Sequence, residues 1–181
     1  TLFRLLAEKA KEGVEVRLMF DAFGNSSNNK PLTKKHLKEI RNTGIQIVKY
    51  DPINFPYINH VFHRDHRKIV VIDGTIGYTG GMNIADYYIQ GLPKIGEWRD
   101  MHVRIEGTAV HDLQKIFLEM WNKETKQNIE GQEFFPEYTC TTDGKQVAIV
   151  DRWPRRSPKL IRRTIAQSIH AAQYKLQIIN P

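Results

Sequence analysis

Residues 63–83 read HRDHRKIVVIDGTIGYTGGMN, and they hold the clearest structural pattern in the chain. The run at 68–72 is almost uniformly apolar, which is typical of a strand buried on both faces in the middle of a sheet. Asp73-Gly74 is a hairpin signal, so residues 75–79 are expected to return as the neighbouring strand. The stretch therefore predicts a β-hairpin inside a larger sheet.

Helical and strand patterns alternate on both sides of this hairpin. Helices are predicted over residues 2–12, 32–44 and 108–124, strands over residues 14–20, 45–50 and 98–107, and a polar loop over residues 21–31. Asn83 is expected to cap a further short helix, with Asp86 three residues on as the second half of a capping box. We therefore predict an α/β fold in which a mixed β-sheet is flanked by helices on both faces.

A second set of patterns near the C-terminus indicates how the chain is divided. Strands are predicted at 146–150 (QVAIV) and 174–180 (YKLQIIN), and a helix is predicted to start at Ser157-Pro158. We assign residues 1–125 to a first domain that lacks its N-terminal part, residues 126–145 to a linker, and residues 146–181 to a truncated second unit. Because both ends fall inside patterned segments, we expect an internal piece of a longer protein.

The composition narrows the classes of partner. The formal net charge of +7 favours anionic partners such as nucleic acid, phosphorylated small molecules or an anionic membrane surface, although a basic protein without such a partner is equally compatible with charge alone. Cys140 is the single cysteine, which excludes an internal disulfide and a cysteine-based zinc site. No apolar run approaches the roughly 20 residues that a membrane-spanning helix needs.

His66, Lys68 and Asn83 together have the chemistry of a phosphate pocket. Residues two apart on a strand share a face, so His66 and Lys68 should point the same way. The histidine can act as a nucleophile or carry a proton, and the lysine supplies a fixed positive charge. Gly80-Gly81 would let the backbone approach an anion closely, and Asn83 would stand at a helix N-terminus, where free N–H groups attract phosphate oxygens.

The spacing His66-x-Lys68-x4-Asp73-x6-Gly80-Gly81-x-Asn83 resembles the HKD motif of the phospholipase D superfamily. The wording around it, followed by WRDMHVRIEGTAV at 98–110, resembles bacterial cardiolipin synthases in particular. The resemblance implies a phospholipase D-like architecture, with residues 146–181 as the start of a second repeat. It also implies phosphatidyl transfer between two phosphatidylglycerol molecules with release of glycerol, at the bacterial cell membrane and without a cofactor or metal.

The resemblance assigns a role to each residue of the motif. His66 would attack the phosphorus and form a phosphohistidine intermediate. Lys68 and Asn83, with Gly80 and Gly81, would bind the phosphate oxygens and stabilise the developing charge. A histidine from a second HKD motif would protonate the leaving alcohol and activate the incoming one. Which of the two histidines is the nucleophile stays open.

Two carboxylates belong to the expected catalytic set. Asp100 is our candidate for the group that orients the nucleophilic histidine, because the strand that follows the short helix could return it to the pocket. Asp73 is part of the motif but sits in the Asp-Gly turn, at the far end of the strand from His66. We therefore expect Asp73 to brace the turn. His60, His63 and His66 are spaced by three, but in an extended loop that spacing does not converge on a metal.

The sequence holds no second His-x-Lys-x4-Asp, since His170 is followed by two alanines. The partners that the resemblance implies are phosphatidylglycerol, an anionic membrane surface, and a second HKD half from the same longer chain or from a symmetric dimer, with no nucleic acid. The isolated piece is expected to be soluble and inactive. Two alternatives remain: a hydrolase of the superfamily (a phospholipase D-type phosphodiesterase or a nuclease), and a non-catalytic module that binds anionic lipid.

Overall fold

The computed structural model of the chain describes residues 2–26, 31–50, 65–85, 87–91, 93, 96–97, 99–139, 144–153 and 159–178. It divides into two compact units, Thr1–Thr139 and Cys140–Pro181. The boundary falls inside the segment 126–145 that the sequence marks as a linker. Residues 126–139 pack within the first unit, where Asn122 exchanges two hydrogen bonds with the backbone of Ile129 and His111 bonds to the carbonyl of Pro136.

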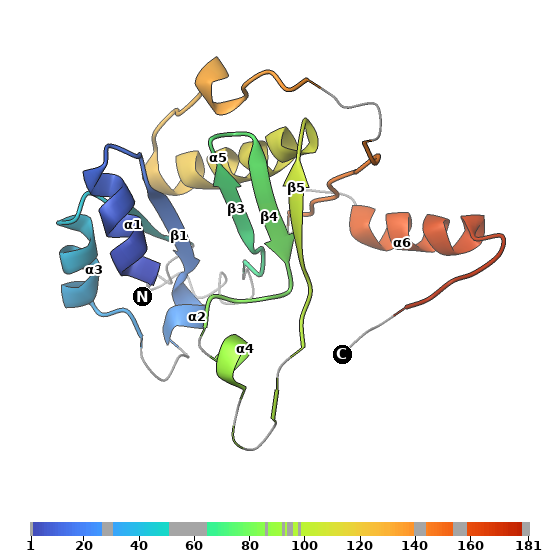
Figure 1. The fold of residues 1–181 in the computed structure, drawn as a ribbon, viewed down its shortest axis with the longest axis horizontal. Helices are drawn as coiled ribbons and strands as arrows, with labels where there is room; N and C mark the ends of the chain where they lie inside the picture. Colours follow the sequence, from blue (N-terminus) through green and yellow to red (C-terminus); the bar gives the residue numbers. More distant parts are fainter. Residues whose placement is uncertain are drawn as a thin grey trace, which may run out of the picture. The chain divides into compact units, whose positions relative to one another are not determined.

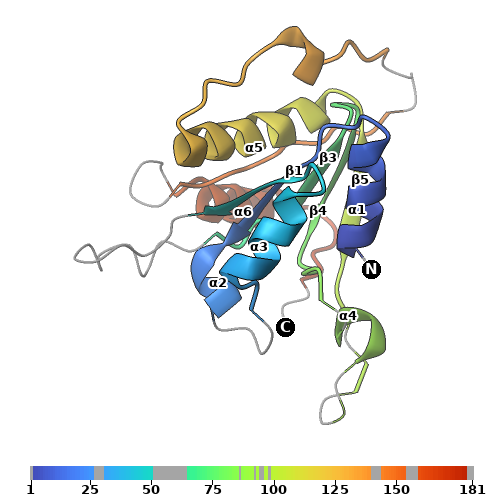
Figure 2. The ribbon, with the colours of Figure 1, turned by 90° about the vertical axis from the view of Figure 1, so that its left-hand side faces the viewer.

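The first unit begins with a two-stranded parallel sheet between helices. Strands β1 (Arg17–Asp21) and β2 (Gln46–Tyr50) pair in register from Arg17 opposite Gln46 to Asp21 opposite Tyr50. Helices α1 (Leu2–Lys11) and α3 (Lys34–Arg41) bury a core cluster against one face, with its centre at Leu37, Ile40, Ile45 and Ile47. Helix α5 (Ala109–Thr125) covers the other face, where Arg17 lies beside the Trp121 ring (Figure 2).

Local contacts fix the ends of these helices, and α3 is shorter than the predicted helix 32–44. Thr33 caps α3 through a capping box with His36, which satisfies free N–H groups of the first turn. Gly13 follows the predicted helix 2–12, and Gly44 is the last residue of the predicted helix 32–44. Their φ of 92° and 93° is a backbone conformation that favours glycine. The predicted polar loop 21–31 instead starts with a short helix, α2 (Ala22–Ser26), because Asp21 Oδ1 accepts the Gly24 N–H at 2.7 Å.

A three-stranded antiparallel sheet follows along the chain. Strand β3 (Ile69–Ile72) pairs with β4 (Ile76–Gly80), and β4 pairs with β5 (His102–Glu106) (Figure 1). The predicted hairpin is confirmed: Asp73 and Gly74 form its turn with φ of 51° and 66°. Gly74 is buried beneath the segment that follows α5, and a Cβ there would lie 2.5 Å from Pro136 Cδ.

Helix α5 also packs on this second sheet and supplies the larger core. Its apolar stripe buries Val110, Leu113, Leu118, Met120 and Trp121. The helix comes so close to β4 at Gly77 that a Cβ there would lie 2.8 Å from Leu113 Cδ1. The glycine at position 77 therefore lets the helix approach the middle strand.

The prediction that residues 68–72 form a strand buried on both faces is wrong. β3 is an edge strand of the three-stranded sheet, and its burial alternates along the strand. Val70 and Ile72 are 42% and 43% exposed on the face away from α5. An apolar run is compatible with burial of both faces of a strand. How many faces are buried depends on which helices or sheets pack against the strand. The α/β class is confirmed, with the described strands divided between two small sheets.

The second unit contains one helix among its described residues, α6 (Leu160–Ala171). The strands predicted at 146–150 and 174–180 are not formed in the parts of those ranges that the structure describes. A strand is stable only when another strand pairs with it, and the described residues of this unit provide none. Ile161, Ile165 and Ile169 recur every fourth residue along α6 and are exposed. None of the helices in the described part of the chain is long and apolar enough to cross a membrane.

Candidate active site

All residues of the HKD-like motif except Asp73 lie at or beside one end of the three-stranded sheet, the end nearer α4 in Figure 1. β3 begins, β4 ends and β5 begins at this end, because Ile69 pairs with Thr79 and Gly80 pairs with His102. His66 and Lys68 lie in the segment that enters β3, and Asp100 lies in the segment that enters β5. The antiparallel order therefore brings together residues that are more than 30 positions apart in the sequence.

Arg67 shows which way its neighbours face. Its guanidinium lies 3.8 Å from Met120 Sδ, on the α5 side of the sheet. Because successive side chains of an extended segment alternate, His66 and Lys68 point to the opposite, open face. The Lys68 ammonium donates a 2.8 Å hydrogen bond to the backbone carbonyl of His66. This bond keeps the Lys68 ammonium close to His66. Because the carbonyl is a neutral acceptor, the ammonium can exchange it for a charged oxygen.

The backbone that carries His66 is held by the residues around it. Arg67 and Asp65, whose side chains are mostly buried, form a 2.9 Å ion pair. The Asp65 N–H donates to Asp21 Oδ2 at 3.1 Å, which ties the entry of β3 to the end of β1. These contacts lie directly before and after His66, so they fix its backbone while its side chain remains exposed.

The glycine pair makes room for side chains of β5 and of the segment before it. A Cβ on Gly81 would lie 2.9 Å from Asp100 Oδ2 and closer still to Oδ1. A Cβ on Gly80 would lie 2.7 Å from His102 Nδ1. The sequence suggests that these glycines let the backbone approach an anion. In the structure, their missing side chains give space to Asp100 and His102.

Asn83 does not cap a helix, so that expectation is wrong. Helix α4 (Tyr87–Gln90) starts four residues later, and Asp86 lies outside the described residues. The Asn83 amide instead donates to the Tyr88 hydroxyl at 2.9 Å. Residues 87–89 are two tyrosines and an isoleucine, which have modest helix propensity, and Gly91 follows with φ of 71°. A helix of one turn offers no strong anion site, so Asn83 can contribute only its side-chain amide.

The two carboxylates lie at opposite ends of the sheet. Asp100 accepts the N–H of Met101 at 2.7 Å through Oδ1, and its carboxylate lies against Gly81 at the His66 end. Asp73 lies in the hairpin turn at the other end of β3. The structure therefore brings Asp100, and not Asp73, to the end of the sheet where His66 and Lys68 lie.

His102 is a further polar residue at this end of the sheet, and the sequence reasoning did not single it out. Its ring lies beside Gly80, where a Cβ on that glycine would be 2.7 Å from His102 Nδ1, at the same end of the sheet as His66. The signal was present in WRDMHVRIEG, where Asp100, His102 and Arg104 alternate along one predicted strand. What the sequence did not show is that the glycine pair lies directly opposite.

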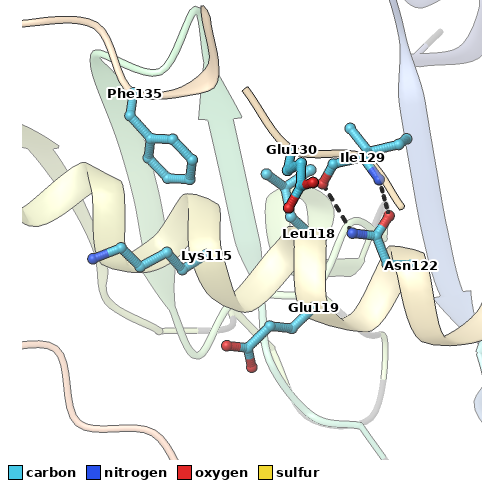
Figure 3. Close-up of a pocket in the computed structure, with 7 residues that line it drawn as sticks. All are labelled: Lys115, Leu118, Glu119, Asn122, Ile129, Glu130 and Phe135. Carbon is cyan, nitrogen blue, oxygen red and sulfur yellow. Dashed lines mark hydrogen bonds between the residues drawn. The ribbon is translucent and has the colours of Figure 1, made fainter. Parts of the chain in front are cut away.

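Other groups contribute no second candidate centre among the described residues. His60 and His63 lie outside them, and the described residues hold no cluster of three histidine, cysteine or acidic side chains that could bind a metal. A shallow cavity of about 170 Å³ lies between α5 and the segment after it (Figure 3). Its lining includes Lys115, Glu119 and Phe135 but none of the motif residues.

Comparison with known proteins identifies the family. Residues 1–121 match the family described as "Cardiolipin synthase, PLD-like domain". The chain belongs to this family. It is 36% identical over 179 residues to a cardiolipin synthase of Halalkalibacterium halodurans, and 39% identical over 184 residues to cardiolipin synthase 2 of Staphylococcus epidermidis. These alignments cover 98% and 99% of the chain but 35% and 36% of the relatives, so the chain spans about a third of the length of the curated relatives that it matches.

Proposed function

We propose that this chain is part of a cardiolipin synthase, which transfers a phosphatidyl group from one phosphatidylglycerol to another and releases glycerol. The observation that supports the proposal is that His66, Lys68 and Asp100 lie in segments at the same end of the three-stranded sheet, in a chain whose family is the cardiolipin synthase, PLD-like domain. A phosphodiester requires a nucleophile, a cation for its charge, and a group that orients the nucleophile. These residues supply all three.

In the first half-reaction, an imidazole nitrogen of His66 attacks the phosphorus of the donor lipid. A bond forms between nitrogen and phosphorus, and the bond between phosphorus and the glycerol headgroup oxygen breaks. The histidine of a second motif gives its proton to that oxygen, so the headgroup leaves as glycerol. In the second half-reaction the same histidine takes the proton from a hydroxyl of the second phosphatidylglycerol, whose oxygen attacks phosphorus and frees His66.

Lys68 and Asn83 would stabilise the charge that develops on the non-bridging oxygens. Lys68 bonds to a neutral carbonyl in the structure, and a phosphate oxygen is a stronger acceptor because it is charged. The Asn83 amide bonds to a phenol hydroxyl and has a second N–H to offer. Both groups can therefore turn to the phosphate without losing a buried partner.

Asp100 would accept a hydrogen bond from the His66 imidazole and hold the ring in the tautomer that attacks. Such a carboxylate also stabilises the positive charge that the ring acquires as the bond to phosphorus forms. The position of Asp100 against Gly81 supports this role, because it places a carboxylate at the sheet end where His66 projects. Only one of its oxygens is engaged by the Met101 N–H.

The second motif would come from the same longer protein, or from a symmetric copy of this chain. The substrates would be held at an anionic membrane surface, which the net charge of +7 favours. The chain on its own would then bind phosphodiester but turn over poorly, since it lacks the acid for the leaving alcohol.

The test uses the protein that carries this chain together with its second motif, supplied with phosphatidylglycerol in mixed micelles. Products are identified by mass spectrometry for the wild type and for His66→Ala. Cardiolipin and glycerol in equal amounts, lost in the variant, are expected. Phosphatidic acid as the main product would assign a hydrolase instead. Lipid binding without any product would leave a binding module.

A further inference from the structure

His102 lies in a row with Lys68 across the open face of the three-stranded sheet. Gly80 pairs with His102, and Tyr78 pairs with both Val70 and Arg104. Side chains two residues apart on a strand share a face, so His102 is on the face of Tyr78 and Val70. The register of β3 and β4, continued by one residue beyond Ile69 and Thr79, sets Lys68 opposite Gly80. The order across the face is therefore Lys68, Gly80, His102.

Gly80 leaves a gap in the middle of this row. Neighbouring strands lie about 4.8 Å apart, so the backbones at Lys68 and His102 are separated by roughly 10 Å. Any other residue at position 80 would conflict with β5, because its Cβ would overlap the Met101 carbonyl oxygen and lie 2.7 Å from both the Cα and the Nδ1 of His102. Gly80 contributes only backbone atoms to the bottom of the gap. Lys68 lies on one side of the gap and the His102 imidazole on the other.

The His102 ring is also free to take a ligand. It is exposed, and in the described part of the chain no hydrogen bond or ion pair involves it. The next residue on the same face of β5, Arg104, is already engaged: it hydrogen-bonds the Tyr78 hydroxyl and pairs with Glu106, and both contacts raise the pKa of Arg104. His102 is the polar side chain of β5 nearest to the His66 end of the sheet, and unlike Arg104 it makes no side-chain hydrogen bond within the described residues.

We propose that His102 contacts the substrate, with a ring N–H donating a hydrogen bond to a non-bridging oxygen of the phosphodiester on the side away from Lys68. The inference rests on the proposed function, since it takes the phosphate of that reaction as the ligand. Lys68 and His102 bind the phosphate oxygens from opposite sides of the gap, and the backbone of Gly80 lies beneath the phosphate. His66, two residues before Lys68, approaches from the open end of the sheet.

The test compares His102→Ala and His102→Gln with Val103→Ala, in the protein that also carries the second motif. Val103 is the next residue on β5, is half exposed and faces the other way, so it controls for disturbance of the strand. Two quantities are measured: kcat/KM with phosphatidylglycerol, and the dissociation constant of inorganic phosphate by calorimetry. Melting temperatures are recorded for all variants.

A hydrogen bond to a charged oxygen is lost in His102→Ala, so kcat/KM should fall, and the dissociation constant for phosphate should rise, by about tenfold or more. His102→Gln keeps an N–H donor and should recover part of both effects. Val103→Ala should leave both within about twofold of the wild type. Wild-type values in His102→Ala, or losses in His102→Gln and Val103→Ala equal to those in His102→Ala, would overturn the proposal.

The two measurements separate this proposal from the proposed function. If the wild type makes no cardiolipin, the proposed function fails, while the phosphate titration still decides whether His102 binds the anion. If His66→Ala abolishes turnover and His102→Ala changes neither quantity, the proposed function stands and the role of His102 is rejected.

Discussion

The carboxylate of Asp100 occupies the space that a side chain on Gly81 would need. The backbones of the two segments are also bonded, because the Gly81 N–H donates to the Met101 carbonyl at 3.1 Å. The Asp100 backbone is therefore held beside position 81, and its carboxylate can leave this place only by changing its rotamer. The motif glycine and the candidate orienting carboxylate form one structural unit.

Gly81→Ala is expected to reduce turnover by displacing Asp100. The φ of Gly81 is not in the positive range, so alanine is tolerated by the backbone, and the nearest atoms to its Cβ are those of the Asp100 carboxylate. We expect kcat/KM to fall at least about tenfold, with a change in the free energy of unfolding of about 1–3 kcal/mol. Steady-state kinetics and chemical denaturation measure the two effects.

The double variant Gly81→Ala/Asp100→Asn distinguishes this explanation from general damage. If the glycine acts through the carboxylate, the two changes are not additive, and the double variant turns over about as slowly as the slower single one. Additive losses would show that Gly81 acts independently of Asp100.

Asp100→Asn is expected to lower kcat by at least about tenfold while the fold is retained. Asparagine can keep the oxygen that accepts the Met101 N–H, but it lacks the charge that stabilises an imidazolium. Asp112→Asn is the matched control, because Asp112 is exposed on α5 and its carboxylate contacts Lys115. Unchanged turnover in Asp100→Asn would remove this carboxylate from the mechanism.

Much of the fold could be predicted because its signals are local. The Asp-Gly turn sets the hairpin between β3 and β4, and the apolar spacing of residues 108–124 matches α5 within one residue at each end. What the sequence could not reveal depends on packing between distant segments. The run at 68–72 does not tell whether one or two layers cover it, and the second face of β3 is open among the described residues.

The candidate site divides in the same way. The spacing of His66 and Lys68 was enough to place both on one face, since alternation is a property of the extended backbone. Asn83 was misplaced because the capping pattern ignores the weak helix propensity of the residues after it. His102 was missed because its position opposite Gly80 depends on the register of two strands, which no local pattern encodes.

Asp65→Asn is expected to destabilise the first unit by about 1–3 kcal/mol. Asp65 pairs with Arg67 at 2.9 Å with both side chains mostly buried, at 14% and 18% exposure, so asparagine removes the ionic attraction of a partly desolvated pair. Because this pair flanks His66, turnover should also fall. Glu8→Gln, which affects an exposed pair with Arg4 on α1, should change the free energy of unfolding by less than about 0.5 kcal/mol. Equal effects of the two substitutions would argue against a structural role for the Asp65 pair.

Gly77→Ala is expected to destabilise the protein without altering the chemistry of the site. Its Cβ would lie 2.8 Å from Leu113 Cδ1 and 3.5 Å from both methyl groups of Val110, so α5 must shift or Leu113 must change rotamer. Overpacking of this kind costs about 1–3 kcal/mol in the free energy of unfolding. Gly24→Ala on α2 is the control, because its Cβ would make an ordinary 3.5 Å contact with Oδ1 of Asp21, the last residue of β1. Replacing Leu113 by alanine in the Gly77→Ala background should relieve the clash, so the two changes together should cost less than the sum of their separate effects. If they add, the close approach of α5 to β4 at Gly77 is not what makes this glycine necessary.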